Sequence, residues 1–324
     1  MDYFLTEEQE MIKETARELA NEKIIPQRAG LDERNEFAAD ILRDIAKADL
    51  FSIFVPEEYG GLGGGCFETV LALEELSRGC VGVATSFAAN GLGILPVLIS
   101  GSKEMKEQYL PSIAEGSRWA AFGLTEAGAG SDAAGVKTTA VLDGDEWVLN
   151  GTKQWITNGG EAQSYTILAL TNPEKGIRGA SLFLVEDGDP GFSYGKKEDK
   201  MGIRASATRE LIMKDCRIPK DRLVGRKGTG FITVMKTLDV SRPSIAALAV
   251  GLGQAALDEA AVYAKQRVQF DKPIISFQAV QHMLADMATE IEAARSLVYM
   301  TALNVDRGCS CRKSIGRNST NWRR

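Results

Sequence analysis

Histidine is almost absent from this chain, since His282 is the only one among 324 residues. Clusters of histidine and cysteine at short spacings hold most protein-bound zinc ions. No two cysteines before residue 308 have such a spacing, so the sequence predicts no metal site. Unpaired thiols of this kind are typical of the cytoplasm. The cysteines are Cys66, Cys80, Cys216, Cys309 and Cys311.

An excess of positive charge and an uninterrupted apolar run are also missing. The net charge of −6 lacks the basic excess of a general nucleic-acid-binding protein. No N-terminal segment joins a basic region to an apolar stretch, so no secretory signal is predicted. The most apolar span, residues 81–99, contains Asn90, Pro96 and several glycines. We expect it to form a buried helix with a bend rather than a membrane span.

The chain of 324 residues is long enough for two or three domains, and its hydrophobic content of 44% is ordinary for a soluble globular protein. Residues 1–118 show helical patterns. Thr6 and Gln9 form a capping box, and apolar residues then recur on one face before Pro26. Ser102 is expected to cap a later helix. We therefore predict an N-terminal α-helical domain.

Residues 119–227 change to short runs of β-forming residues. Asp143 and Gly144 lie between two such runs and are typical of a two-residue hairpin. Helices do not alternate with these runs, which favours an antiparallel sheet or small barrel over a Rossmann unit. The expected strands cover residues 120–124, 138–142, 146–149, 165–170, 181–185 and 210–213.

Helical periodicity returns in residues 228–307, where we predict two long helices, the first with Pro243 near its first turns. The fold class is therefore α+β, and the C-terminal helical-bundle domain is incomplete. Residues 308–324 form an atypical tail with five basic residues, no acidic residue and no helical period. A tail that binds an anionic partner is one interpretation; a truncation or frameshift is the one we favour.

The most informative segment is the glycine-rich stretch at residues 122–135. Gly128 and Gly130 supply backbone freedom where a bulky ligand lies close to the main chain. Thr125, Ser131 and the N–H groups around them can bind phosphate or ring heteroatoms. Taken alone, such a stretch is as often a plain turn as a binding loop.

Three further segments follow in order. Residues 151–158 contain Trp155, which composition alone would place in the core. Residues 239–243 contain Asp239 and Arg242, which alone suggest an oppositely charged pair near a helix N-terminus. A fourth segment, from residue 267 to residue 274, alone suggests a solvated helix end followed by a proline stop. Its arginine would suit a diphosphate, since the guanidinium donates several hydrogen bonds.

In this order the four segments resemble the signatures of the acyl-CoA dehydrogenase family, and the resemblance extends to about residue 307. Ala127 stands where most members have proline, and Asp271 where glycine is usual. The resemblance implies an N-terminal α-helical domain, a middle β domain and a C-terminal four-helix domain. It also implies FAD as cofactor, acyl-CoA as substrate, and α,β-dehydrogenation to the trans-2-enoyl-CoA in fatty acid β-oxidation.

The family motifs also imply roles for individual residues. The Trp-Ile-Thr portion packs on the flavin, and the fourth segment binds the adenosine and pyrophosphate end of FAD from a neighbouring subunit. The implied acyl-CoA-binding positions are Ser131, Asp239 and Arg242. The implied FAD-binding positions are Phe122, Leu124, Thr125, Gly130, Ser131, Trp155, Ile156, Thr157, Arg267, Gln269, Phe270 and Gln278.

The catalytic base is the group that this sequence does not supply. In most members it is a glutamate close to the C-terminus, and a minority place it where this chain has Ser241. A serine hydroxyl cannot act as that base. Glu259, Glu290 and Glu292 match no base position and are expected to be surface or interhelix charges. We therefore expect no catalytic residue within this chain, as in a C-terminally truncated or frameshifted copy.

The implied partners are an electron-transfer flavoprotein and, in the full-length form, further copies of the chain in a dimer of dimers. Two other functions stay open. One is a non-catalytic short form that binds acyl-CoA or flavin. The other is a related acyl-CoA oxidase that passes electrons to oxygen.

Overall fold

The computed structural model describes residues 5–308 and begins with one long helical stretch. Helix α1 (Glu7–Leu19) has the expected capping box between Thr6 and Gln9. The helix does not stop before Pro26, however. A π-helical segment (Ala20–Ile24) continues directly into α2 (Ile25–Glu33), where Pro26 occupies the first turn. Proline is tolerated at that position, and the wider π turn joins the two helices.

Four more helices complete the N-terminal part: α3 (Ala39–Lys47), α4 (Cys66–Gly79), α5 (Val81–Ser100) and α6 (Lys103–Ala114). The side chain of Ser102 accepts a hydrogen bond from the Met105 N–H, which confirms the predicted cap of α6. Short 3-10 turns occupy Leu50–Phe54 and Glu57–Tyr59. Two helices, α5 and a later one, are long and apolar enough to cross a membrane by length and composition alone, which is weak evidence. As expected, α5 is mostly buried within the protein.

The middle part is one sheet of eight strands in the order β6-β7-β3-β2-β4-β5-β8, with β1 beside β4. The predicted hairpin is present between β2 and β3, with Asp143 opposite Glu146, so the turn falls one residue later than expected. The sheet is mixed rather than purely antiparallel, because β1 and β4 run parallel. The β2–β3 hairpin lies between them in the chain and acts as the crossover that a parallel pair needs. The strands are β1 (Ala120–Gly123), β2 (Thr139–Asp143), β3 (Glu146–Thr157), β4 (Ser164–Leu170), β5 (Ala180–Glu186), β6 (Phe192–Tyr194), β7 (Thr208–Pro219) and β8 (Leu223–Val224).

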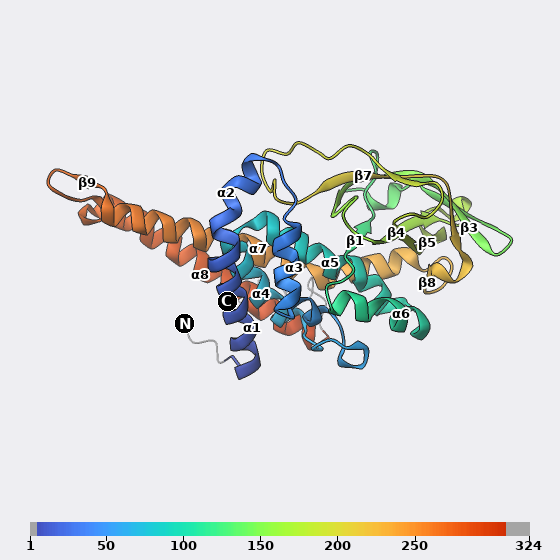
Figure 1. Ribbon diagram of the computed structural model, residues 1–324, viewed down its shortest axis with the longest axis horizontal. Helices are drawn as coiled ribbons and strands as arrows, with labels where there is room; N and C mark the ends of the chain where they lie inside the picture. The colour runs from blue at the N-terminus through green and yellow to red at the C-terminus, as the bar shows by residue number, and fades with distance from the viewer. Residues whose placement is uncertain (1–4, 309–324) are drawn as a thin grey trace, which may run out of the picture.

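Two long helices follow the sheet and form an antiparallel hairpin that projects from the body (Figure 1). They are α7 (Gly230–Gln266) and α8 (Gln278–Asp306), joined by the short strands β9 (Val268–Gln269) and β10 (Lys272–Pro273) and the 3-10 turn Ile274–Ser276. Because α7 begins at Gly230, Pro243 lies in the helix interior and not near its first turns. The remaining residues of the predicted tail, 309–324, lie outside the described part.

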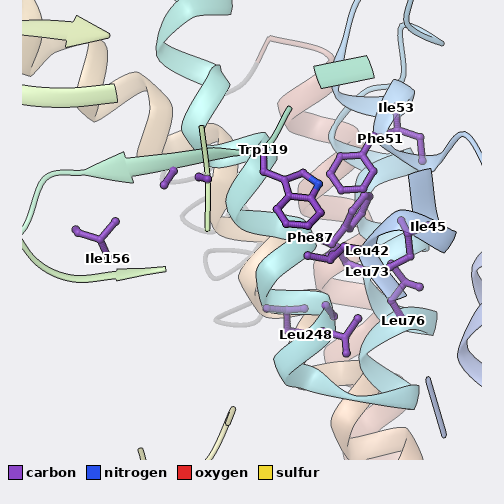
Figure 2. Packing of buried hydrophobic residues seen from close by; sticks show 14 of the residues in the cluster. Leu42, Ile45, Phe51, Ile53, Leu73, Leu76, Phe87, Trp119, Ile156 and Leu248 are labelled. Atoms are coloured by element: carbon purple, nitrogen blue, oxygen red, sulfur yellow. The ribbon is translucent and has the colours of Figure 1, made fainter. Parts of the chain in front are cut away.

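One hydrophobic core joins the helices to the sheet. Figure 2 shows Phe51, Phe87 and Trp119 packed together, with Leu73 and Leu248 lying below them. These side chains come from a 3-10 turn, three helices and the residue that precedes β1. The helical and β parts are therefore packed directly on each other, and the site described next lies where they meet.

Candidate cofactor and substrate site

Two threonine-bearing segments lie side by side at the edge of this junction. Thr125 follows β1, and Thr157 ends β3. The Gln154 N–H donates a hydrogen bond of 2.8 Å to the Thr125 carbonyl oxygen, which ties the two segments together. Both threonine side chains are half-buried. The structure thus brings together the residues that the sequence assigned to the flavin ring.

Trp155 is 60% exposed, so the core position favoured by composition alone is wrong. The cause is a register shift between β3 and β7 at residues 153–156, with a φ of 62° at Trp155. This bulge turns the indole out of the sheet. An exposed indole beside two half-buried hydroxyls is a surface suited to an aromatic ring system. Ile156, next in the chain, is buried in the core.

Lys153, two residues before Trp155, is fully buried. Its Nζ donates to Glu126 Oε1 at 2.7 Å and to the Leu124 carbonyl oxygen at 3.1 Å. Desolvation lowers the pKa of Lys153 to about 8, although the Glu126 charge opposes this. Burial alone would raise the pKa of Glu126, yet Lys153 and the donors around it hold that pKa below its usual value.

The glycine-rich loop after Glu126 offers space at the surface. A Cβ added at Gly128 or Gly130 would meet no atom within 4 Å. Ser131 is exposed beside them. Phe122 and Leu124 instead belong to the hydrophobic cluster that also contains residues of α5 and α6. A ligand can therefore approach the backbone closely along this loop.

A cavity of about 450 Å³ opens beside Thr157. One wall is a single face of α5, and the opposite wall is formed by α7 through Val240, Ser241, Ser244 and Ile245. Its lining is mainly apolar, which suits an acyl chain. The α5 wall consists of Thr85, Ala88, Ala89, Gly91, Leu92, Leu95 and Leu98.

The cavity-facing stretch of α7 is interrupted by Pro243. Proline has no N–H, so the carbonyl oxygen of Asp239 lacks its usual helical partner. Asp239 is half-buried and Arg242 is exposed, and both flank Ser241 in the cavity wall. They lie in mid-helix, so the interpretation as a charged pair at a helix N-terminus is wrong.

Two carboxylates line the described part of the cavity, Glu58 and Asp306. The Asp306 oxygens accept hydrogen bonds from the Cys66 N–H at 2.7 Å and the Phe67 N–H at 2.9 Å. Asp306 therefore caps the N-terminus of α4 and fixes the end of α8 against it. Burial raises its pKa, in spite of these two bonds.

The residues of the fourth segment lie at the tip of the α7–α8 hairpin, far from the sheet (Figure 1). Arg267, Gln269, Phe270 and Gln278 are all exposed. Ser241 and Arg267 are separated by one helix, about 39 Å at ~1.5 Å per residue. Within one chain the tip therefore does not meet the threonine-bearing segments.

The three expected non-catalytic glutamates are surface or interhelix charges. Glu259 pairs with Arg28 of α2 at 2.9 Å, and Glu292 pairs with Arg295 on its own helix at 2.5 Å. Glu290 is exposed. Residues 5–308 contain no group of three His, Cys, Asp or Glu side chains able to hold a metal ion.

A mixed sheet packed against helices, an exposed indole two residues before Thr157, and an apolar cavity lined by Thr157 form a surface suited to a planar ring next to an apolar ligand. Comparison with known families agrees. The N-terminal, middle and C-terminal acyl-CoA dehydrogenase domain models match residues 6–117, 121–216 and 228–317. The chain belongs to the acyl-CoA dehydrogenase family, whose members are FAD-dependent oxidoreductases acting on the CH–CH bond of acyl-CoA.

Individual relatives span most of the chain. The Mycobacterium leprae protein named "Probable acyl-CoA dehydrogenase fadE25" is 46% identical over 304 residues, which are 94% of this chain and 78% of that protein. The butyryl-CoA dehydrogenase structure from Megasphaera elsdenii has a TM-score of 0.93 and 39% identity, covering 97% of this chain and 84% of that one. An acyl-CoA dehydrogenase from Bacillus anthracis, complexed with FAD, has a TM-score of 0.86 and 38% identity, covering 92% of this chain and 51% of that one.

These matches confirm the predicted family, fold class and cofactor class. The C-terminal match extends to residue 317, ten residues past the expected end of the family pattern, so the boundary at residue 307 and the truncation stay predictions. Sequence reasoning missed the cavity wall on α5 and the buried Lys153–Glu126 pair. The α5 residues that line the cavity recur every three or four residues, which is the spacing of one helix face. The sequence does not reveal this face, because α5 is apolar on every side.

Proposed function

We propose that this chain binds FAD and an acyl-CoA and takes part in α,β-dehydrogenation of the thioester to the trans-2-enoyl-CoA in fatty acid β-oxidation. The observation that carries the proposal is the shared site of Thr157, Trp155 and Ser241. Thr157 and Ser241 line one apolar cavity, and Trp155, two residues before Thr157 on the same strand, exposes its indole. A flavin and an acyl group need such adjacent but chemically different surfaces.

In this proposal the flavin ring lies against the surface formed by Trp155 and Thr157, with Thr125 and the open loop near Gly130 and Ser131 as further contacts. Phe122, Leu124 and Ile156 support that surface from behind. When bound, FAD accepts the β hydrogen of the substrate as hydride. The acyl group occupies the cavity, and Asp239 and Arg242 on the flank of α7 hold the CoA portion together with Ser131.

The proposal assigns no catalytic base among residues 5–308. Asp306 is occupied as a helix cap, Glu58 is exposed, and the Ser241 hydroxyl cannot remove an α proton. Residues 309–324 contain no Asp or Glu, so the proposal assigns the base to no carboxylate of this chain. The chain's own contribution is to bind the thioester, orient it and exclude water.

We also propose that the tip of the α7–α8 hairpin acts on a second copy of the chain. Arg267, Gln269, Phe270 and Gln278 would then bind the pyrophosphate and adenosine end of an FAD held by the neighbouring sheet. The distance of about 39 Å along a continuous helix supports this assignment, because the tip cannot reach its own chain's flavin surface. The assembly would be a homo-oligomer, with a dimer of dimers in the full-length form, located in the cytoplasm.

Stopped-flow absorbance after mixing the FAD-loaded protein with an acyl-CoA tests the proposal. Because no carboxylate of this chain is assigned as the base, the expected result is tight acyl-CoA binding with little bleaching of the flavin band, and bleaching when a small carboxylate such as formate is added as the base. Tight acyl-CoA binding without bleaching even in the presence of formate would instead support a non-catalytic binding protein. Bleaching followed by peroxide formation in air, without a further acceptor, would support an oxidase.

A further inference from the structure

Lys153 is the one large, charged side chain that the core encloses completely among the described residues. Its partner Glu126 forms further hydrogen bonds in addition to the one from Lys153. Glu126 also accepts hydrogen bonds from the Lys137 N–H at 2.7 Å, the Thr138 N–H at 3.1 Å and the Thr138 hydroxyl at 2.6 Å. One carboxylate thus fastens the end of the β1 segment to the start of β2 and to the middle of β3.

These contacts surround Thr125 on both sides. Lys153 binds the residue before it, Leu124, through the main chain and the residue after it, Glu126, through the side chain. The carbonyl oxygen of Thr125 itself accepts from Gln154, the neighbour of Lys153. The backbone of Thr125 is therefore fixed relative to β3 at three consecutive residues.

The bulge that begins at this lysine changes which way β3 presents its next residues. In a regular strand, residues 153 and 155 would point to the same face. Here Lys153 is buried and Trp155 is exposed, because the bulge at residues 153–156 reverses the pattern. Lys153 lies on the same buried face as Trp147 and Leu149. The bulge after it makes Ile156 the next buried residue and turns Trp155 outward with a positive φ.

We propose that the buried Lys153–Glu126 ion pair is the positioning element of the flavin surface: it holds Thr125 and the Trp155–Thr157 stretch in the conformation that receives the isoalloxazine ring. The inference rests on the proposed function, which supplies the ligand. A buried ion pair is by itself weak evidence for a stabilising role. Buried pairs replaced by apolar residues of similar size often leave a protein equally stable.

The test compares the wild-type chain with Lys153→Met, which keeps the length of the side chain and removes its charge. Thr138→Val is a milder second variant, since it weakens the hold on Glu126 without leaving a charge unpaired. Arg217→Met is the matched control: Arg217 forms an ion pair with Glu146 at 3.0 Å across the same β3–β7 pair, but at the surface. FAD affinity is measured from the quenching of flavin fluorescence, and amide hydrogen exchange is measured on the FAD-free chain.

We expect Lys153→Met to raise the Kd for FAD at least tenfold and Thr138→Val to raise it severalfold, with Arg217→Met within twofold of wild type. Exchange should speed up in peptides covering residues 122–127 and 153–158 and stay unchanged in β5. If Lys153→Met fails to fold, FAD affinity and amide hydrogen exchange are both measured on Thr138→Val instead.

An unchanged Kd, or faster exchange spread evenly over the whole sheet, would overturn the positioning role. A wild-type chain that binds no FAD would contradict the proposed function instead. In that case the exchange pattern of the FAD-free variants alone decides whether the ion pair positions the two segments.

Discussion

Gly251 lies where α7 crosses α4 at very short range. A Cβ added there would be 2.1 Å from the Glu74 carbonyl oxygen and 3.0 Å from both the Glu74 carbonyl carbon and the Ser77 Cβ. Cβ atoms in proteins essentially never come within 3.0 Å of a non-bonded heavy atom. Gly251→Ala therefore forces the two backbones apart by roughly an ångström, since neither obstructing atom of Glu74 belongs to a flexible side chain.

Two effects of opposite sign compete in this variant. Alanine in place of glycine within a helix gains about 1 kcal/mol. Overpacking a tight contact costs about 1–3 kcal/mol, and a clash with backbone belongs at the upper end. Separation of the helices also lengthens the hydrogen bond of 2.7 Å from the Ser77 hydroxyl to the Leu248 carbonyl oxygen, which contributes about 1 kcal/mol. We expect a net loss of about 2–3 kcal/mol in the free energy of unfolding.

Gly253→Ala is the matched control on the same helix. Its Cβ would lie 3.4 Å from the side chain of Ile291, an ordinary contact, so this variant should gain up to about 1 kcal/mol. Chemical unfolding followed by circular dichroism measures both. If Gly251→Ala were as stable as wild type, or if both substitutions changed stability in the same direction, the close crossing of α4 and α7 would not exist as described.

Four further outcomes are expected. Glu74→Gln, which removes the buried charge 2.7 Å from Arg295 while Glu292 stays paired with it, should cost about 1–3 kcal/mol in an unfolding titration, against less than ~1 kcal/mol for Glu259→Gln at the exposed pair. Ala88→Phe should narrow the cavity and shift the ranking of acyl-CoA dissociation constants toward shorter acyl groups; an unchanged ranking would place the acyl group elsewhere. Phe270→Ala, at an 86% exposed side chain, should weaken FAD binding and self-association in sedimentation without lowering the melting temperature. Since the pKa of Lys153 is lowered from 10.5 to about 8 in the folded chain, the unfolded chain binds more protons between those values, and the wild-type stability relative to Lys153→Met should rise with pH across that window.

Local sequence rules predicted the elements that depend on neighbouring residues. The capping box at Thr6 and the cap at Ser102 are both present, because such bonds form within one turn of the helix. The hairpin near Gly144 also formed, with Gly144 at a φ of 63°. Pro26 was different: a proline predicts an end to the helix, and only the whole structure shows that a π segment continues it.

The candidate site was predicted from its motifs but not from the physics of single residues. Trp155 illustrates the difference, because hydrophobicity alone places an indole inside and the motif places it against a cofactor. The structure exposes it through a bulge that no period-two pattern predicts. Lys153 presents the converse case, since a lysine in a strand with exposed neighbours would ordinarily be assigned to solvent. Its burial depends on Glu126, 27 residues earlier in the chain, and long-range pairing of this kind leaves no local signal.

The long α7 helix connects two parts of the site that one chain cannot bring together. Its first half forms a wall of the acyl cavity around Ser241, and its far end carries the residues at the hairpin tip. In a symmetric pair of chains, each tip that reaches a neighbouring flavin extends from a helix that also lines its own cavity. In the proposed assembly, a displacement of α7 would therefore change the cavity of one copy and the cofactor contacts of the other. The close crossing at Gly251 lies between these two ends of the helix.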